Sequence, residues 1–207
     1  MSPKVSEKHL EDRRQQILDA AVTSFSRKGF HQATIEDIRL EAGLSRGAVY
    51  HYFKSKEDII DGLRQRSADQ TDSIFAHVAA IEDPLDYLIG LVHSTLDRII
   101  SPASLDANRL ALFLWAESLV NRRIMDGQLS SSGAYRQRIE ASVRGAQAQS
   151  NINSDLDPSA IALVITGALI GLQQQVSWEP GLDMNMARRV LIAMLTGDFR
   201  KEPAAPI

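Results

Sequence analysis

Residues 34–56 read TIEDIRLEAGLSRGAVYHYFKSK, and this stretch decides the fold of the N-terminal part of the chain. Thr34 and Ser45 each precede a short helical pattern and can accept an early backbone N–H, as N-cap residues do. Gly43 lies between the two patterns, where a left-handed conformation costs most other residues about 1 kcal/mol or more. Two short helices joined by such a turn form a helix-turn-helix. The core that fixes their angle is expected to be Ala33, Ile35, Ile38, Leu44, Val49 and Phe53.

The second of these helices has the features of a recognition helix. Val49 and Phe53 face the expected core, so the residues between and before them point outward. Gly47 and Ala48 carry little bulk, which lets the backbone enter a major groove, and Arg46 is long enough to reach a base edge. Phosphate contacts are expected from Tyr50, His51, Lys54 and Lys56.

Composition places the chain among soluble globular proteins. It has 207 residues, of which 44% are hydrophobic and 24% charged, and this length suits one or two domains. The net charge of −3 gives no general attraction to polyanions. The segment 43–56, however, contains Arg46, Lys54 and Lys56 and no acidic residue, so a phosphate-binding surface is expected there.

Residue types that are missing exclude several classes of site. The chain has no cysteine, which rules out disulfides, zinc–thiolate sites and thiol nucleophiles. The N-terminal residues have no apolar segment typical of a secretory signal, and together with the lack of cysteine this favours a cytoplasmic protein. The longest apolar run, residues 161–172, is shorter than the ~20 residues that cross a bilayer.

The spacing of apolar residues is helical almost everywhere, and no stretch alternates as a half-buried strand does. We therefore predict an all-α fold of about nine helices. On the first helix, Leu10, Ile17, Leu18, Ala21 and Phe25 share one face, and Gly29 is placed as a C-cap. The expected helices cover about residues 10–28, 34–43, 45–53, 55–78, 84–101, 104–120, 122–150, 158–176 and 184–198.

The run GLSRGAVYHYFKSKE, residues 43–57, resembles the DNA-binding signature of the TetR family of bacterial transcriptional regulators. The specific likeness covers about residues 10–60, and beyond it the helix count and order resemble the AcrR/BetI-like branch of that family. By this resemblance Thr34, Arg46, Gly47, Tyr50, His51 and Lys56 match positions that commonly touch DNA. With Ser45, Ala48 and Lys54 they complete the set of predicted DNA-binding residues.

The resemblance also implies an organisation and a mode of action. It implies an N-terminal arm and three-helix helix-turn-helix DNA-binding domain over residues 1–56, and a larger helical effector-binding and dimerisation domain over residues 57–200. Residues 201–207 are expected to form a disordered tail. It further implies a homodimeric repressor that binds a palindromic double-stranded DNA operator and is released when a small-molecule effector binds the second domain.

A symmetric operator requires two recognition helices and hence a dimer interface. Residues 161–172 are apolar nearly all round, and Gly167 and Gly171, four residues apart, would let another helix approach closely. The last helix is its expected companion. The predicted interface residues are Leu163, Gly167, Ile170, Gly171, Val190 and Met194, and the alternative is a helix buried within one subunit.

An effector cavity is suggested by residues 110–120, where apolar side chains and Glu117 share one helical face. A buried carboxylate is costly unless it is paired, so Glu117 could meet a cationic ligand. The alternative is a Glu117 that is solvated or paired with Arg122 or Arg123. The candidate effector-binding residues are Tyr87, Leu91, Phe113, Leu114, Glu117 and Gln173, with an amphipathic or cationic effector. Aromatic residues at this spacing are also typical of an ordinary core.

An enzyme is the main rival class. The chain has no glycine-rich phosphate loop, nucleophile elbow, HExxH motif or identifiable Ser/His/Asp grouping. We expect no catalytic residue, no cofactor, no metal site and no membrane association. Two alternatives stay open, namely a DNA-binding protein controlled by a protein partner or by its own concentration, and a purely structural helical dimer.

Overall fold

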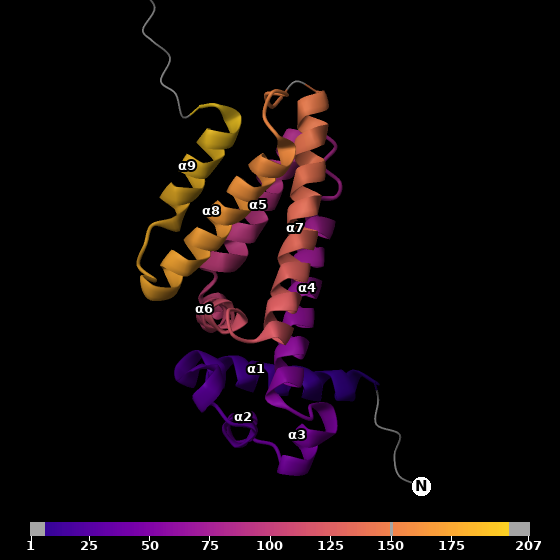
Figure 1. The fold of residues 1–207 in the computed structure, drawn as a ribbon, viewed down its shortest axis with the longest axis vertical. Coiled ribbons are helices and arrows are strands. Elements are labelled where there is room, and N and C mark those ends of the chain that lie inside the picture. The colour runs from indigo at the N-terminus through magenta and orange to yellow at the C-terminus, as the bar shows by residue number, and fades with distance from the viewer. Residues whose placement is uncertain (1–6, 150, 199–207) are drawn as a thin grey trace, which may run out of the picture. The chain divides into compact units, whose positions relative to one another are not determined.

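The computed structural model describes residues 7–149 and 151–198, and these residues form nine α-helices and one short 3-10 turn (Figure 1). The predicted all-α fold and its helix count are confirmed for this part of the chain. The helices are α1 (Glu7–Gln32), α2 (Ile35–Ala42), α3 (Arg46–Tyr52), α4 (Lys56–Val78), α5 (Pro84–Ile100), α6 (Leu105–Ser118), α7 (Arg122–Ala148), α8 (Pro158–Trp178) and α9 (Met184–Thr196), with η1 (Pro102–Ser104) before α6.

Short-range caps set most helix starts where the sequence places them. The Thr34 hydroxyl accepts the Asp37 N–H at 3.1 Å, and the Asp37 carboxylate accepts the Thr34 N–H at 2.9 Å, which completes a capping box on α2. Ser45 accepts the Ala48 N–H at the start of α3. Asp83 and Asp157 cap α5 and α8, each followed by proline at the first helical position.

Two glycines adopt the left-handed conformation that the predicted turns require. Gly43 ends α2 with φ 64° and donates its N–H to carbonyls of the last turn. Gly29 has φ 74°, but a further helical turn follows it to Gln32. The predicted end of the first helix at residue 28 is therefore a break in α1 rather than its end.

The described chain divides into two compact units. The N-terminal unit contains the described residues up to Thr71 together with Asp106–Ser132, and the C-terminal unit contains Asp72–Leu105 and the described residues from Gly133 onward. Helices α4 and α7 each contribute residues to both units. A functional boundary at residue 56 stays a prediction, and the predicted tail, residues 201–207, lies outside the described residues.

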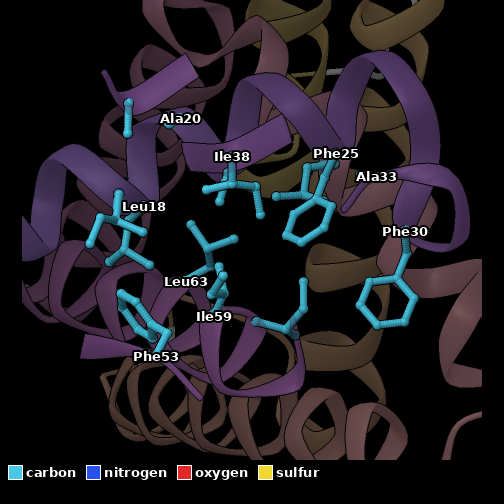
Figure 2. Close-up of a cluster of buried hydrophobic side chains, with 14 of the residues drawn as sticks. Leu18, Ala20, Phe25, Phe30, Ala33, Ile38, Phe53, Ile59 and Leu63 are labelled. Carbon is cyan, nitrogen blue, oxygen red and sulfur yellow. The ribbon is translucent and has the colours of Figure 1, made fainter. Parts of the chain in front are cut away.

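The core of the N-terminal unit joins α1, α2, α3 and the first half of α4 (Figure 2). Of the predicted helix-turn-helix core, Ala33, Ile38, Val49 and Phe53 are buried, and Ile35 and Leu44 pack partly buried against them. On α1 the predicted face is buried except for Leu10, which is 38% exposed. The large buried side chains outside these two predicted sets are Phe30, Ile59, Ile60, Leu63, Leu110 and Ile124.

Gly62 allows α4 to approach this core closely. A Cβ on Gly62 would lie 2.9 Å from the Phe53 ring and 3.1 Å from a Leu18 methyl group. Phe53 directly follows α3 and Leu18 belongs to α1, so this glycine lies where three elements meet. Its backbone needs no positive φ, and the requirement for glycine is one of space.

In the C-terminal unit, α5 packs against α8 and α9. Its main core consists of Leu88, Val92, Leu96, Ile99, Ile139, Val143, Ala162, Ile165, Leu169, Val176 and Met184. By length and composition alone α8 could cross a membrane, and it is the one such helix within the described ranges. One face of α8 is buried in the core while the other carries exposed apolar residues, a pattern also typical of a helix at a protein interface.

Gly62→Ala is expected to lower the free energy of unfolding by about 1 to 2 kcal/mol, because overpacking outweighs the gain in helix propensity. Gly47→Ala is the matched control, since a Cβ there meets no atom within 4 Å, and it should leave stability unchanged or raise it by up to about 1 kcal/mol. Urea denaturation of both variants measures the difference. Equal stability of the two would show that the contact between Gly62 and Phe53 is not tight.

Candidate DNA-binding interface

The exposed side of α3 presents a cation, a glycine and an aromatic side chain within two turns. Arg46 and Gly47 are exposed, and Ala48 and Tyr50 are partly exposed. The Arg46 guanidinium lies 5.5 Å from the centroid of the Tyr50 ring, within the range of a cation–π contact. The helix has no acidic residue in its first turn. Arg46 is therefore supported by Tyr50 and has no carboxylate beside it on this helix.

Nothing among the described residues explains a glycine at position 47. Its φ is not in the left-handed region, and an added Cβ would meet no atom within 4 Å. Gly43, by contrast, is required by its positive φ. A small residue that neither the backbone nor the packing demands is expected where another molecule approaches the helix.

Two further cationic or polar side chains flank α3 on its C-terminal side. His51 is exposed, and its ring stands edge-on to that of Tyr52 at 5.1 Å. Lys54 is exposed, and its Nζ donates to the Tyr50 carbonyl at 2.5 Å, which satisfies one of the open carbonyls at the end of α3. The Lys54 backbone N–H donates to the Asp58 carboxylate at 3.1 Å.

Thr34 makes more hydrogen bonds within the fold than the sequence indicated. Its hydroxyl donates to the Asp37 carboxylate at 2.9 Å in addition to accepting the Asp37 N–H. The same carboxylate accepts a hydrogen bond from Lys28 Nζ at 2.8 Å. The bond from Lys28 and those from the Thr34 N–H and hydroxyl lower the pKa of Asp37 to about 2. The start of α2 therefore carries an ionised carboxylate paired with Lys28.

Lys56 is bound to the end of α1. Its Nζ donates to the carbonyls of Phe30 at 2.8 Å, Ala33 at 3.1 Å and His31 at 3.3 Å, and it lies 4.7 Å from the centroid of the Phe30 ring. An ammonium group has three N–H donors, and these bonds use all of them. A phosphate contact by Lys56 would have to replace some of these bonds.

Three residues that sequence reasoning missed also hold the helix-turn-helix together. Arg39 donates to the Leu44 carbonyl at 3.0 Å across the turn and pairs with Glu36, and the hydrogen bond to Glu36 raises the pKa of Arg39. Gln16 of α1 donates to the Ala42 carbonyl at 2.7 Å. Arg123 pairs with both Asp58 and Asp61 of α4, and the bond from Arg123 lowers the pKa of Asp58. Local sequence patterns give no signal for Gln16 or Arg123, whose partners are 26 to 65 residues away.

The predicted effector-binding residues fall into both units. Phe113, Leu114 and Glu117 belong to the N-terminal unit, and the carboxylate of Glu117, whose side chain is 9% exposed, lies 2.7 Å from His31 Nε2. Neither arginine considered from the sequence is its partner. The Phe113 ring contacts Gly29, and Leu114 packs against the core.

Tyr87, Leu91 and Gln173 belong to the C-terminal unit. Leu91 is buried with Phe75 and Val78, and Gln173 is half-buried. Tyr87 lines a solvent-open cleft of about 440 Å³ together with Phe75, Ile81, Glu82, Pro84 and Arg138.

The predicted dimer residues lie at the surface of the C-terminal unit. Leu163 of α8 is 55% exposed, and Val190 and Met194 of α9 are 49% and 57% exposed. Gly167 is exposed, and Ile170 and Gly171 are partly exposed. A Cβ on either glycine would meet no atom within 4 Å. Packing within the chain therefore does not explain these two glycines.

Residues 17–63 match the family model for bacterial regulatory proteins of the tetR family. This segment covers most of α1, all of α2 and α3 and the start of α4, which together carry the interface described above. The fold and this match define the class: residues 17–63 are similar to the helix-turn-helix segment of bacterial regulatory proteins of the tetR family.

Named relatives agree with this assignment. An HTH-type transcriptional repressor of Mycobacterium tuberculosis is 29% identical over 177 residues, covering 82% of this chain and 87% of the relative. The uncharacterised HTH-type regulator YfiR of Bacillus subtilis is 41% identical over 96 residues, covering 41% of this chain and 46% of YfiR. The regulator BetI of Serratia proteamaculans is 32% identical over 110 residues, covering 52% of this chain and 54% of BetI, which supports the predicted BetI-like branch.

Solved structures share the fold over nearly the whole chain. A transcriptional regulator of Saccharomonospora viridis, crystallised in complex with choline, is 28% identical with a TM-score of 0.75, and the match covers 87% of this chain and 94% of that one.

Lys56→Ala is expected to lower the free energy of unfolding by about 1 to 3 kcal/mol, because it leaves three carbonyls without their donor. Lys54→Ala is the control, since Lys54 makes one exposed bond at a helix end and should cost less than about 1 kcal/mol. Chemical denaturation of the two variants gives both values. If Lys56→Ala is as stable as the wild type and instead lowers the salt dependence of DNA binding, the lysine contacts phosphate, as the sequence predicted.

Proposed function

We propose that this protein is a transcriptional repressor that binds a palindromic DNA operator as a homodimer and is released by a small-molecule effector. The observation that carries the DNA-binding part is Gly47, an exposed and open position on α3 next to Arg46. No contact in the described part of the chain requires a glycine there. The family assignment supports the same reading.

In this proposal α3 enters a major groove with its N-terminal end toward the bases. Arg46 would donate to a base edge, and Gly47 and Ala48 would allow the helix backbone to come close. Phosphate contacts would come from Tyr50, His51 and Lys54, which are exposed or partly exposed. Thr34, Ser45 and Lys56 would act mainly by fixing the starts of α2, α3 and α4, through the caps and carbonyl bonds described above.

The proposed homodimer pairs α8 and α9 with the same helices of a second copy. The exposed apolar residues of α8 and α9 would contact water in a single subunit and would be buried in the dimer. Exposed apolar patches of this kind mark protein interfaces. A two-fold axis through this patch would present two recognition helices to half-sites about one helical turn of DNA apart, or a small multiple of it.

The proposed effector site lies in the C-terminal unit, where the cleft beside Tyr87 is found. The choline complex of the Saccharomonospora viridis regulator supports a small-molecule ligand for this fold. An effector can shift the protein away from its DNA-binding state only by its differential affinity for the two states, typically about 1 to 3 kcal/mol. A regulator of this kind would act in the cytoplasm, where its DNA is.

Selection of bound duplexes from a random DNA library, with the bound species sized in the same experiment, tests the proposed function. We expect a palindromic consensus held by a dimer. Failure of a folded sample to enrich any sequence would contradict it.

Arg46→Ala is then expected to reduce discrimination at one base pair of each half-site by about 1 to 3 kcal/mol. Gly47→Leu should abolish binding to all sequences without loss of stability, because it fills the open position. Arg109→Ala is the control, since Arg109 lies on α6 beside Asp106. Titration of the selected operator and its single-base variants measures these effects. Unchanged discrimination in Arg46→Ala, with full binding by Gly47→Leu, would remove α3 from the groove.

Gly167→Leu is expected to weaken the dimer, because the added side chain separates two helices that approach closely at this position. The monomer should keep its stability, since a Cβ at Gly167 meets no atom of its own chain within 4 Å. Gly133→Leu is the matched control, since Gly133 is also a helical glycine with no atom within 4 Å of an added Cβ. Sedimentation of the variants over a range of concentrations checks this. A dimer of unchanged affinity in Gly167→Leu would exclude this face of α8 from the interface.

A further inference from the structure

The C-terminal unit contains a small cluster of hydrogen-bond donors without matching acceptors. Arg98 of α5 is half-buried, and its Nε is buried without a partner among the described residues. No described carboxylate pairs with its guanidinium, and the ionisable group that influences it is Tyr135. Desolvation lowers the pKa of Arg98, yet a guanidinium keeps its proton in proteins, so the charge is held at a cost.

Two hydroxyl groups complete this cluster. Thr95 Oγ1 and the Tyr135 hydroxyl lie 3.0 Å apart and share one hydrogen bond. Burial raises the pKa of Tyr135, so its hydroxyl is protonated at neutral pH. The shared bond uses one of the two hydroxyl protons, which leaves one hydroxyl proton beside a buried Arg98 Nε–H that has no acceptor among the described residues. Such a donor surplus is the chemistry of a site that receives an anion.

A buried apolar cluster adjoins the donors. Leu91, Thr95 and Arg98 are spaced i, i+4 and i+7, so they follow one face of α5. Leu91 is buried with Phe75 and Val78, and the ring of Tyr135 packs edge-on against Phe75 at 5.5 Å. Phe75 also lines the open cleft of about 440 Å³. Tyr135 thus belongs to the donor cluster and also contacts Phe75, a residue that lines the cleft.

Two other arginines of this unit have carboxylate partners. Arg188 also has a buried Nε without a partner, but its terminal nitrogens contact Asp97 at 2.5 Å and His93 at 3.5 Å. Arg138, at the cleft, pairs with Asp72 at 2.7 Å and stacks on Phe75. Glu117, which suggested a cationic effector from the sequence, is paired with His31. Arg98 differs from Arg138 and Arg188 in that no described carboxylate pairs with it.

We propose that Arg98, Tyr135 and Thr95 form the receptor for the oxyanion head of an amphipathic organic anion whose apolar body packs near Phe75, Val78 and Leu91. This ligand class deepens the proposed function, because the anion would be the effector. A carboxylate and a phosphate monoester share the required head, and both fit the planar fork of a guanidinium.

Calorimetric titration of the full-length protein without DNA tests the proposal. The probes are alkyl carboxylates from hexanoate to palmitate, alkyl phosphates of the same lengths, and alkyltrimethylammonium salts as cationic counterparts. We expect at least one anionic series to bind the wild type about tenfold or more tightly than the ammonium of equal length. A preference for one of the two anionic series identifies the head group. Equal or tighter binding of every ammonium overturns the proposal, and so does the failure of all anions to bind.

Variants assign the binding to this cluster. Arg98→Met should weaken the best anion by about tenfold or more, since it removes a charge-assisted bond, and Tyr135→Phe by about two- to tenfold. Arg144→Met is the matched control, because Arg144 is exposed and paired with Glu140 on α7, and it should bind like the wild type. If Arg138→Met abolishes binding while Arg98→Met does not, the head binds in the cleft and the proposal is wrong.

Stability of the unliganded variants gives a second readout. Arg98→Met should melt at the same temperature as the wild type or higher, because a desolvated and unpaired charge is removed. A marked loss of stability would mean that Arg98 has a structural role. Should that variant not fold, Arg98→Lys keeps the charge without the fork and is expected to lower anion affinity while retaining the preference over ammonium. Since these measurements contain no DNA, they can succeed even if operator selection fails, and the reverse also holds.

Discussion

The ammonium group of Lys56 is the contact on which the geometry of the helix-turn-helix depends. It stands at the first residue of α4 and binds three carbonyls that follow the break at Gly29 near the end of α1. Backbone carbonyls at a helix end are costly when they have no donor, and here a single side chain satisfies three of them. Six residues later, Gly62 brings α4 against Leu18 and Phe53. The positions of α2 and α3 between these helices follow from those two fixed points.

Local signals allowed much of the fold to be predicted. Thr34, Ser45, Asp83 and Asp157 cap helices through amides two or three residues away, so the sequence alone contains both partners. Contacts between distant residues could not be predicted in this way. Nothing near Glu117 indicates that its partner is His31, because helical periodicity shows which residues share a face but not which face meets it.

The candidate site was predictable to the same extent. The outward residues of α3 follow from the burial of Val49 and Phe53, and the structure leaves Arg46, Gly47 and His51 exposed as expected. The sequence could not separate cations that are available to DNA from those that hold the fold. Lys54 and Lys56 are the same residue type two positions apart, and only the structure shows that Lys56 binds three carbonyls. The sequence likewise could not show that the effector candidates belong to two different units. It also gave no sign that Arg98 of α5 has a buried nitrogen without a partner.

An unpaired cation costs the protein more stability when it is buried than when it is exposed. Arg46 is exposed, so water solvates its guanidinium and the absence of an ion pair costs little stability. Arg98 keeps a buried nitrogen without a partner beside two hydroxyls, and a group of this kind destabilises the protein unless something completes its hydrogen bonds. Natural proteins keep such destabilising groups mainly where function requires them. Arg46 is therefore consistent with a DNA partner that other evidence supports, whereas the buried Nε of Arg98 is the basis of the proposed anionic partner.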